Sequence, residues 1–240
     1  MARKAVNEAL EQAGQTPADD GVPEWKRQSV ERSLQAARVR AQARSDRFVS
    51  ATLELMQENA STDFTVQDVV DRSHMSIRTF YNFFASKDDL LVAVHETILA
   101  KEVVPRLRAR CQAEVDPVER IRAYIEGLYD LSARTGPVSR ALTTYYNRLA
   151  ETRPADLDRA FRSQIDLVVE LVRHAAATGR LRPDLDPDKI AHLLHHTVLS
   201  AVHGRILGSD SRDLSAQDLW AFCGHGIGVQ PARGRRVPKR

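Results

Sequence analysis

"TVQDVVDRSHMSIRTFYNFFASKDDLL", residues 65–91, contains three short segments that each open on a hydroxyl residue. Thr65 and Ser86 are each followed three residues later by an aspartate, and Ser76 directly precedes Ile77. A hydroxyl at the N-cap accepts a hydrogen bond from an orphan backbone N–H, and an acid in the first turn suits the helix dipole. The stretch therefore predicts three helix starts in close succession, separated by tight corners.

The middle segment, residues 77–84, has two chemically different faces when it is drawn as a helix of about 100° per residue. Its large apolar side chains share one side and should anchor it: Ile77, Phe80 and Phe84. Its polar side chains fall opposite: Arg78, Thr79 and Asn82. Tyr81 lies on the border between the two sides. Such a short helix suits a groove better than a core.

The preceding segment, residues 66–72, has a valine packing face and is joined to the middle segment by residues 73–76 alone. Two short helices with so tight a turn are typical of a helix-turn-helix, whose second helix enters the major groove of DNA. Arg78 and Asn82 carry the donors and acceptors that suit guanine and adenine edges. Residues at helix starts can bind phosphates. We expect this of Thr65, Tyr81 and Lys87.

The same stretch, extended to "FTVQDVVDRSHMSIRTFYNFFASKDDLL", resembles the DNA-binding signature of TetR (tetracycline repressor)-type transcriptional regulators over roughly residues 48–94. The resemblance implies that Tyr81 and Lys87 contact phosphates and that Ser76, Arg78, Thr79 and Asn82 face the operator. The full set of predicted DNA-binding residues is Thr65, Ser76, Ile77, Arg78, Thr79, Tyr81, Asn82, Phe83, Lys87 and Arg44.

Four positions depart from the family pattern. Ser73-His74 replaces the usual Ala-Gly of the turn, and His can adopt the left-handed conformation that Gly adopts freely. Arg78 stands where Gly is common and adds a long cationic side chain. Phe83 stands where a polar residue is usual, and it either meets thymine methyl groups or covers the helix end. These changes affect the operator sequence rather than the mode of binding.

The composition is that of a folded chain of 240 residues with 42% hydrophobic residues, enough for a real core. Cys111 and Cys223 lie far apart without metal-ligand spacing, which argues against a disulfide framework and a zinc finger. No signal-peptide pattern or membrane-span length of apolar residues occurs, so we expect a cytoplasmic protein without membrane contact.

Charge is distributed unevenly along the chain. Residues 26–47 carry a net charge of +5, residues 231–240 add five basic residues without an acid, and the remainder is net acidic. This asymmetry indicates that the two basic segments of the chain bind a polyanion. The alternatives are a solvated helix face for the first run and a solubilising tail for the second. Arg38, Arg40 and Arg44 are candidates for the minor groove or flanking phosphates.

The domain prediction has five parts: a flexible leader (1–24), a basic extension helix (25–44), a helix-turn-helix DNA-binding domain (45–92), a helical effector-binding and dimerisation domain (93–228) and a basic disordered tail (229–240). The extension helix either runs into the next helix, 45–59, or bends before it. The later helices are expected at 88–110, 117–134, 138–150, 155–178, 187–207 and 215–227. No run has strand periodicity, so the predicted fold is all-α: a three-helix DNA-binding domain and a larger C-terminal helical domain.

"AHLLHHTVLSAVHG", residues 191–204, concentrates histidines on one helix. An i, i+4 pair can bind a metal, but no further ligand follows at a suitable spacing, so no metal or other cofactor is predicted. The alternatives are packing against a two-fold mate and lining a cavity. The resemblance implies that the last two long helices form a four-helix bundle in a homodimer on a partly palindromic operator. The candidate interface residues are His192, His195, Leu199, His203 and Trp220.

The resemblance also implies a pocket for an unidentified small-molecule effector that releases the operator, although aromatics on amphipathic helices are more often core. The candidate lining is Tyr124, Tyr129, Tyr145, Tyr146, Phe161 and His196. The predicted function is thus a ligand-responsive transcriptional regulator, usually a repressor, and not an enzyme. The alternatives are an architectural DNA-binding protein without an effector and a metal-dependent hydrolase that uses the histidine cluster.

Overall fold

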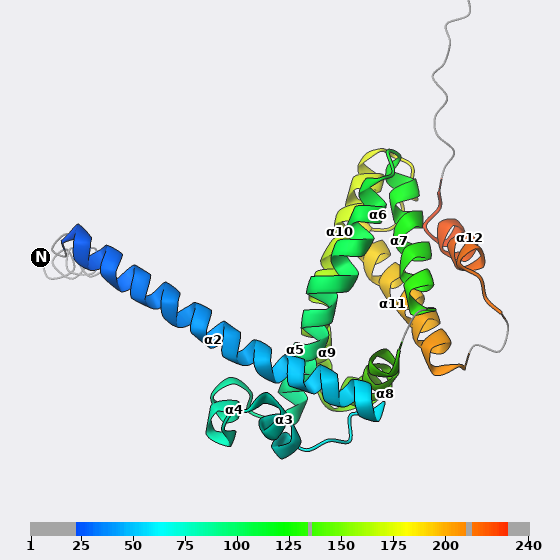
Figure 1. Cartoon of the computed structure of the whole chain (residues 1–240). Coiled ribbons are helices and arrows are strands. Elements are labelled where there is room, and N and C mark those ends of the chain that lie inside the picture. Colours follow the sequence, from blue (N-terminus) through cyan, green and yellow to red (C-terminus); the bar gives the residue numbers. More distant parts are fainter. Residues whose placement is uncertain (1–22, 134–135, 210–212, 230–240) are drawn as a thin grey trace, which may run out of the picture. The chain divides into compact units, whose positions relative to one another are not determined.

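The computed structural model describes residues 23–133, 136–209 and 213–229, so nearly all of the predicted leader and tail lie outside the described residues. The chain divides into two units between Asp46 and Arg47, which are described separately. Helix α2 (Glu24–Asn59) crosses this boundary as one continuous helix (Figure 1).

The first unit consists of the N-terminal part of α2. Every described residue up to Arg44 is exposed, including the apolar Trp25 and Leu34. The candidate arginines of the extension, Arg38, Arg40 and Arg44, are all exposed on this helix.

The second unit begins with the last turns of α2 and the three short helices α3 (Val66–Ser73), α4 (Ile77–Phe83) and α5 (Lys87–Ile98). Thr65, Ser76 and Ser86 cap these three helices with their side-chain oxygens, as predicted. Phe48 of α2 and Phe80 of α4 are both fully buried and meet edge to face, with 5.5 Å between their ring centroids. A single aromatic core therefore fixes the angle between helices too short to be stable alone.

The rest of the second unit is a helical bundle. Helix α5 continues through a π-helical turn, η1 (Leu99–Val103), into α6 (Val104–Gln112). The remaining helices are α7 (Pro117–Ser132), α8 (Pro137–Thr152), α9 (Pro154–Ala160), α10 (Arg162–Ala177), α11 (Pro187–Leu207) and α12 (Ala216–Gly226). The part of the chain that the structure describes contains no strand, and the predicted all-α fold is confirmed (Figure 1).

Two features of the bundle differ from the prediction. The helix expected at 155–178 is broken at Phe161, which separates α9 from α10. The helix expected at 88–110 contains the π-helical turn η1. Neither Gly nor Pro marks the break at Phe161, so the sequence gives no local signal for it. Pro105 follows η1 closely and lacks the N–H that an α-helix would bond to the carbonyl of Lys101, so it is a local signal for the π-helical turn. Both irregularities lie beside the cavity described below.

Two hydrophobic cores fill the second unit. One is built from α6, α7, α10, α11 and α12. The other joins the aromatic core of the short helices to residues of α8 and the α9 region, such as Tyr145, Leu149 and Phe161. The core beneath the helix-turn-helix therefore extends past residue 92 into the region predicted to bind the effector.

Candidate nucleic-acid interface and effector cavity

Helix α4 is held from one side by Phe80 and Phe84, of which 0% and 8% are exposed. The prediction that Ile77 also anchors this helix is wrong, because 43% of Ile77 is exposed. Ile77 is the first residue of α4, directly after the N-cap Ser76, where the turn lies at the edge of the aromatic core. The exposed Ile77 therefore joins the surface that α4 presents outward.

The opposite side of α4 presents the predicted polar side chains. Arg78, Tyr81 and Asn82 are exposed. Thr79 is half-buried, its N–H donates to Ser76 Oγ over 3.1 Å, and the two hydroxyl oxygens lie 2.8 Å apart. The outward side of α4 thus combines a cation, a phenol and an amide on a helix with fixed ends.

Phe83 is half-buried at the end of α4 and packs against Phe48, with 6.4 Å between the ring centroids. This contact favours the alternative in which Phe83 covers the helix end. The turn before α4 contains His74 in the left-handed conformation, with φ of 55°. The amide of His74 donates to Asp71 and Val70 carbonyls and so ends α3.

Thr65 is exposed at the start of α3, where it forms a capping box with Asp68. Its N–H donates to Asp68 Oδ2 over 2.7 Å, and the amide of Asp68 donates back to Thr65 Oγ1 over 3.1 Å. The hydrogen bonds from Thr65 hold the pKa of the Asp68 carboxyl below its usual value. Thr65 therefore has a structural role beside the predicted phosphate contact.

Lys87 is bound to its own chain. Its ammonium group donates to the carbonyl oxygens of Thr62 and Phe64 over 2.6 and 2.7 Å and lies 4.9 Å from the centre of the Phe64 ring. Burial lowers the pKa of Lys87. An ammonium group has three hydrogens, so these two bonds leave one donor for a phosphate. Lys87 fixes the segment that precedes α3 to the start of α5.

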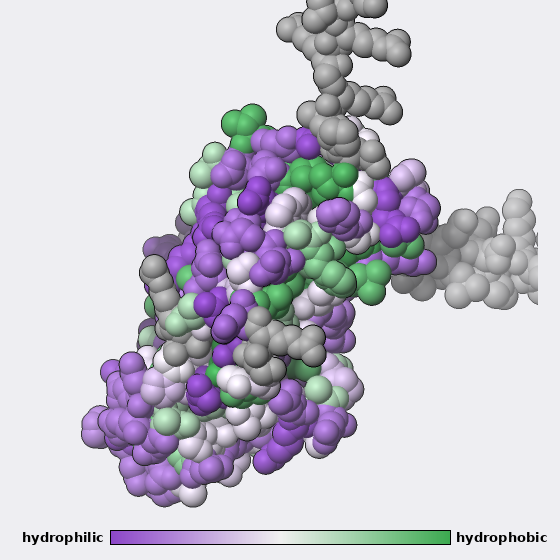
Figure 2. Space-filling model, turned by 90° about the vertical axis from the view of Figure 1, so that its right-hand side faces the viewer, coloured by the Kyte–Doolittle hydropathy of each residue, from purple (hydrophilic) through white to green (hydrophobic). Residues whose placement is uncertain are grey.

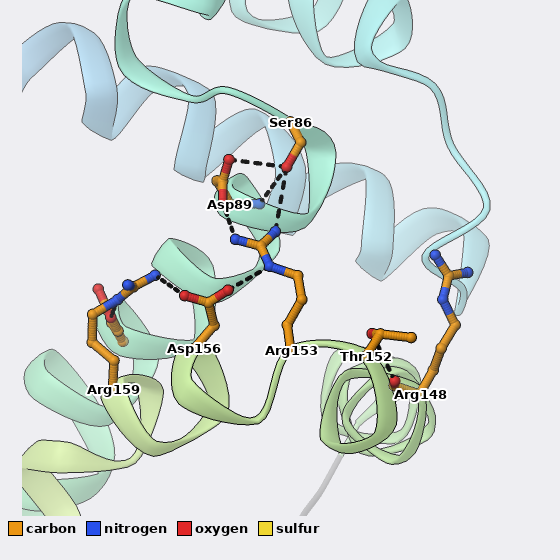
Figure 3. A network of polar contacts seen from close by, with 8 residues as sticks. Ser86, Asp89, Arg148, Thr152, Arg153, Asp156 and Arg159 are labelled. Atoms are coloured by element: carbon orange, nitrogen blue, oxygen red, sulfur yellow. Dashed lines mark hydrogen bonds and ion pairs between the residues drawn. The ribbon is translucent and has the colours of Figure 1, made fainter.

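A second set of polar contacts links α5 to the corner between α8 and α9 (Figure 3). The guanidinium of Arg153 donates to Asp89 Oδ1 over 2.5 Å, to Ser86 Oγ over 3.5 Å and to Asp156 Oδ2. Ser86 is the N-cap of α5 and Asp89 lies in its first turn. One arginine thus connects the bundle to the helix that follows the helix-turn-helix.

A cavity of about 270 Å³ opens between α5, η1, α7, α8, α11 and the start of α10. Its lining is His95, Ile98, Leu99, Glu102, Val103, Arg106, Leu128, Leu131, Ser132, Ser139, Leu142, Thr143, Tyr146, Phe161, Gln164, Leu199, Val202, His203 and Ile206. Helix α5 contributes His95 and Ile98, so the helix that begins beside Arg153 ends at this cavity.

The predicted pocket residues divide into two groups. Tyr146 and Phe161 line the cavity. The other four are absent from its lining: Tyr124, Tyr129, Tyr145 and His196. Tyr124 is fully buried against Gln164, Tyr129 donates to the carbonyl of Leu214, and His196 is exposed on α11. The sequence located aromatic side chains on the right helices, but it could not indicate which of them face inward.

The predicted interface residues also lie in different environments. His192 is exposed on α11, whereas 1% of His195 is exposed. Leu199 and His203 line the cavity, and Trp220 is half-buried on α12. Sequence reasoning missed Leu193 and Phe222, which are 60% and 71% exposed on α11 and α12. Among the described residues, no group of three His, Cys, Asp or Glu side chains is placed to hold a metal ion.

Residues 48–94 match the family model of bacterial regulatory proteins, tetR family. Residues 48–94 therefore carry the DNA-binding domain of this family. The chain is 31% identical over 105 residues to the HTH-type transcriptional regulator BetI of Stenotrophomonas maltophilia, a match covering 43% of this chain and 53% of that protein. It is 26% identical over 106 residues to BetI of Paraburkholderia phymatum, covering 44% and 54%. The chain thus spans about half the length of the curated relatives it matches.

Solved structures share the fold over most of the chain. Thermus thermophilus FadR, a TetR-family transcriptional repressor in complex with lauroyl-CoA, has a TM-score of 0.61 and 23% identity and covers 82% of this chain and 100% of its own. RolR in complex with resorcinol has a TM-score of 0.63 and 20% identity, covering 83% and 97%. The family model and the curated relatives describe transcriptional regulators, the class of protein that the sequence predicts.

Membrane insertion is not indicated by the described helices, since none of them combines the length and the apolar character that a membrane span requires.

Proposed function

We propose that this TetR-family chain is a cytoplasmic repressor that binds a partly palindromic operator as a homodimer and releases it when a small molecule enters the cavity. The observation that carries the proposal is the geometry of α4. Phe80 and Phe84 hold one side of the helix, while Arg78 and Asn82 are exposed on the other. Exposed donors and acceptors on a short, rigidly held helix suit the edges of base pairs in a major groove.

The phosphate contacts are proposed for the residues that flank α4. Tyr81 is 57% exposed, and Thr65 is exposed at the N-terminus of α3. Backbone N–H groups and the dipole at a helix N-terminus favour a phosphate. Lys87 contributes its remaining donor from the start of α5. Exposed Arg44 and its neighbours on α2 supply additional positive charge for flanking DNA.

Release of the operator is proposed to act through α5. This helix starts at Ser86, next to Arg153, and brings His95 and Ile98 to the cavity. An effector shifts an equilibrium only if it binds one conformation better than the other. An occupant that contacts α5 and α8 together favours one relative position of these helices. That choice sets the position of the helix-turn-helix, which shares a hydrophobic core with α8.

Dimerisation is proposed to use α11 and α12. Leu193 and Phe222 are large apolar side chains that are mostly exposed on these two helices. Figure 2 faces the side of the second unit where α11 and α12 lie, and hydrophobic residues there interrupt a hydrophilic surface. One short recognition helix contacts few base pairs, so two copies are needed to select one site in a genome.

The proposal is tested by selecting genomic fragments with the purified full-length chain and assaying the selected fragment in a gel shift. One sequence should resist excess random competitor DNA, and its two half-sites should be related by two-fold symmetry. Equal competition by random DNA would favour an architectural binder without sequence preference and would overturn the proposal. Light scattering with and without the fragment measures whether the chain is dimeric.

A further inference from the structure

The cavity contains polar atoms that its own walls leave without partners. His95 and Tyr146 are 7% and 4% exposed, and both line the cavity. Within the described residues, no hydrogen-bond partner lies near His95 Nε2 or the Tyr146 hydroxyl. Leaving a buried donor unpaired is costly. The two rings lie next to each other, with centroids 4.4 Å apart, so the two unpartnered groups belong to one cluster of side chains.

Three other polar groups of the wall already donate to the protein. The hydroxyl of Ser132 donates to the Tyr129 carbonyl over 2.6 Å, and that of Thr143 donates to the Ser139 carbonyl over 2.8 Å. The amide nitrogen of Gln164 donates to the Tyr124 hydroxyl over 3.1 Å. The Tyr146 hydroxyl has no such acceptor among the described residues, and an oxygen atom of an occupant would supply one.

The inner wall offers no counter-charge among the described residues. The ionised side chains of the lining are Glu102 and Arg106, and both are exposed. Burial lowers the pKa of His95 to about 3 and also lowers the pKa of His203, so both rings are neutral near pH 7. A buried ion without a partner is strongly disfavoured. The wall therefore disfavours an occupant with a charged group in the buried part of the cavity.

The remainder of the wall is apolar. It includes Leu142 of α8, Leu199 and Val202 of α11, and the ring of Phe161. Phe161 contacts the edge of Tyr146 at 5.5 Å and of His95 at 4.6 Å between ring centroids. The three rings meet edge to face and so pack against one another.

From this arrangement we infer the chemical class of the effector: an uncharged, mainly apolar small molecule with a hydroxyl or carbonyl oxygen that accepts a hydrogen bond from Tyr146 beside His95. The inference rests on the proposed function, since it specifies the ligand of the proposed effector cavity. A volume of about 270 Å³ suits a compact molecule.

The test uses four probes that share a benzene ring: benzyl alcohol, toluene, benzoate and benzyltrimethylammonium. Their dissociation constants for the full-length protein are measured by ligand-observed NMR titration. Benzyl alcohol should bind most tightly, and both charged probes should bind at least tenfold more weakly. This ranking on the unmodified chain needs no variant. Tighter binding of either charged probe, or no binding of any probe, overturns the inference.

Two matched variants locate the oxygen contact. Tyr146→Phe removes one unpartnered hydroxyl and should weaken benzyl alcohol about five- to tenfold while leaving toluene unchanged. Tyr145→Phe removes the neighbouring hydroxyl on the same helix, outside the cavity lining, and should change neither probe. Equal losses in both variants would overturn the role of Tyr146.

A gel shift on the selected operator distinguishes a failure of the inferred ligand class from a failure of the proposed function. This assay uses the unmodified chain. If a specific operator is bound but a charged probe is preferred, the ligand class fails and the regulator stands. If no sequence resists competitor DNA, the proposed function fails, whatever the probes do.

Discussion

Arg153 Nη2 lies 2.5 Å from Asp89 Oδ1, so a residue at the α8–α9 corner is bound to the first turn of α5. Both side chains are partly exposed, at 31% and 25%. Burial disfavours the charged form of Asp89, but hydrogen bonds from Arg153 and Ser86 outweigh it, and the pKa of Asp89 falls below its usual value. The pair therefore stabilises the folded chain near neutral pH, and this contribution is lost as the pH falls through the lowered pKa.

The first prediction concerns the strength of this link. Arg153→Met and Asp89→Asn, alone and combined, form a double-mutant cycle on the free energy of unfolding in urea. We expect a coupling energy of about 1–2 kcal/mol, because the bond is charge-assisted but partly exposed to water. A coupling energy indistinguishable from zero would show that the corner and α5 are not linked by this pair.

The second prediction separates structure from DNA contact at Lys87. Lys87→Met removes two hydrogen bonds to the carbonyl oxygens of Thr62 and Phe64. The free energy of unfolding should fall by about 1–2 kcal/mol, since the group is only partly buried. Affinity should also fall similarly for all DNA sequences, with a weaker salt dependence. Unchanged stability measured by urea denaturation would contradict the structural part of this role.

The third prediction concerns sequence readout by Arg78. This side chain is exposed and takes part in no ion pair or hydrogen bond within the described ranges. Arg78→Ala should leave stability unchanged but cost about 1–3 kcal/mol of binding free energy on the selected operator and relax specificity at one base position. Gel-shift titrations on the operator and on random DNA measure this difference. Equal losses on both would assign Arg78 to phosphate contact instead.

Local signals in the sequence predicted the helix-turn-helix well. The hydroxyl caps at Thr65, Ser76 and Ser86 and the buried Phe80 depend on neighbours within one or two turns, so short-range periodicity reveals them. Ile77 was misassigned because periodicity gives the direction of a side chain but not where the core ends. The first residue of α4 is exposed and does not belong to the aromatic core.

The lining of the cavity is set by contacts between distant parts of the chain, which no local sequence pattern reveals. Tyr146 and Phe161 were found as aromatics on amphipathic helices, but nothing distinguished them from Tyr124, which packs in the core. His95 had no sequence signal because its partners come from α8 and the α9–α10 break. In the sequence, Arg153 is recognisable only as the residue before a proline, because its partner Asp89 lies 64 positions away.

The fourth prediction concerns the turn between α3 and α4. His74 has φ of 55°, a conformation that costs a residue with a side chain more than Gly. His74→Gly should raise the free energy of unfolding by roughly 0.5–1 kcal/mol. Glycine removes the backbone strain of the left-handed conformation, and this relief outweighs the larger conformational entropy that glycine gives the unfolded chain. Thermal unfolding gives the measurement. A lower melting temperature would mean that the imidazole makes a stabilising contact in the turn.

The fifth prediction concerns the pH dependence of stability. Burial lowers the pKa of His95 to about 3 and of His195 to about 4, against 6.5 for an ordinary histidine. Both rings stay neutral in the folded chain at pH 5, whereas the unfolded chain binds a proton at each. The unfolded state therefore binds more protons, and stability falls as the pH drops below about 6.5.

Each buried histidine should lower the free energy of unfolding by about 2 kcal/mol when the pH falls from 7 to 5. His95→Leu should reduce the loss over this interval by one such step, and the further change His195→Leu should reduce it by a second. Urea denaturation at both pH values measures the loss for each protein. An unchanged loss in the single variant would mean that His95 is protonated in the folded chain. A charged His95 in the cavity wall would also favour anionic effectors over the neutral class inferred here.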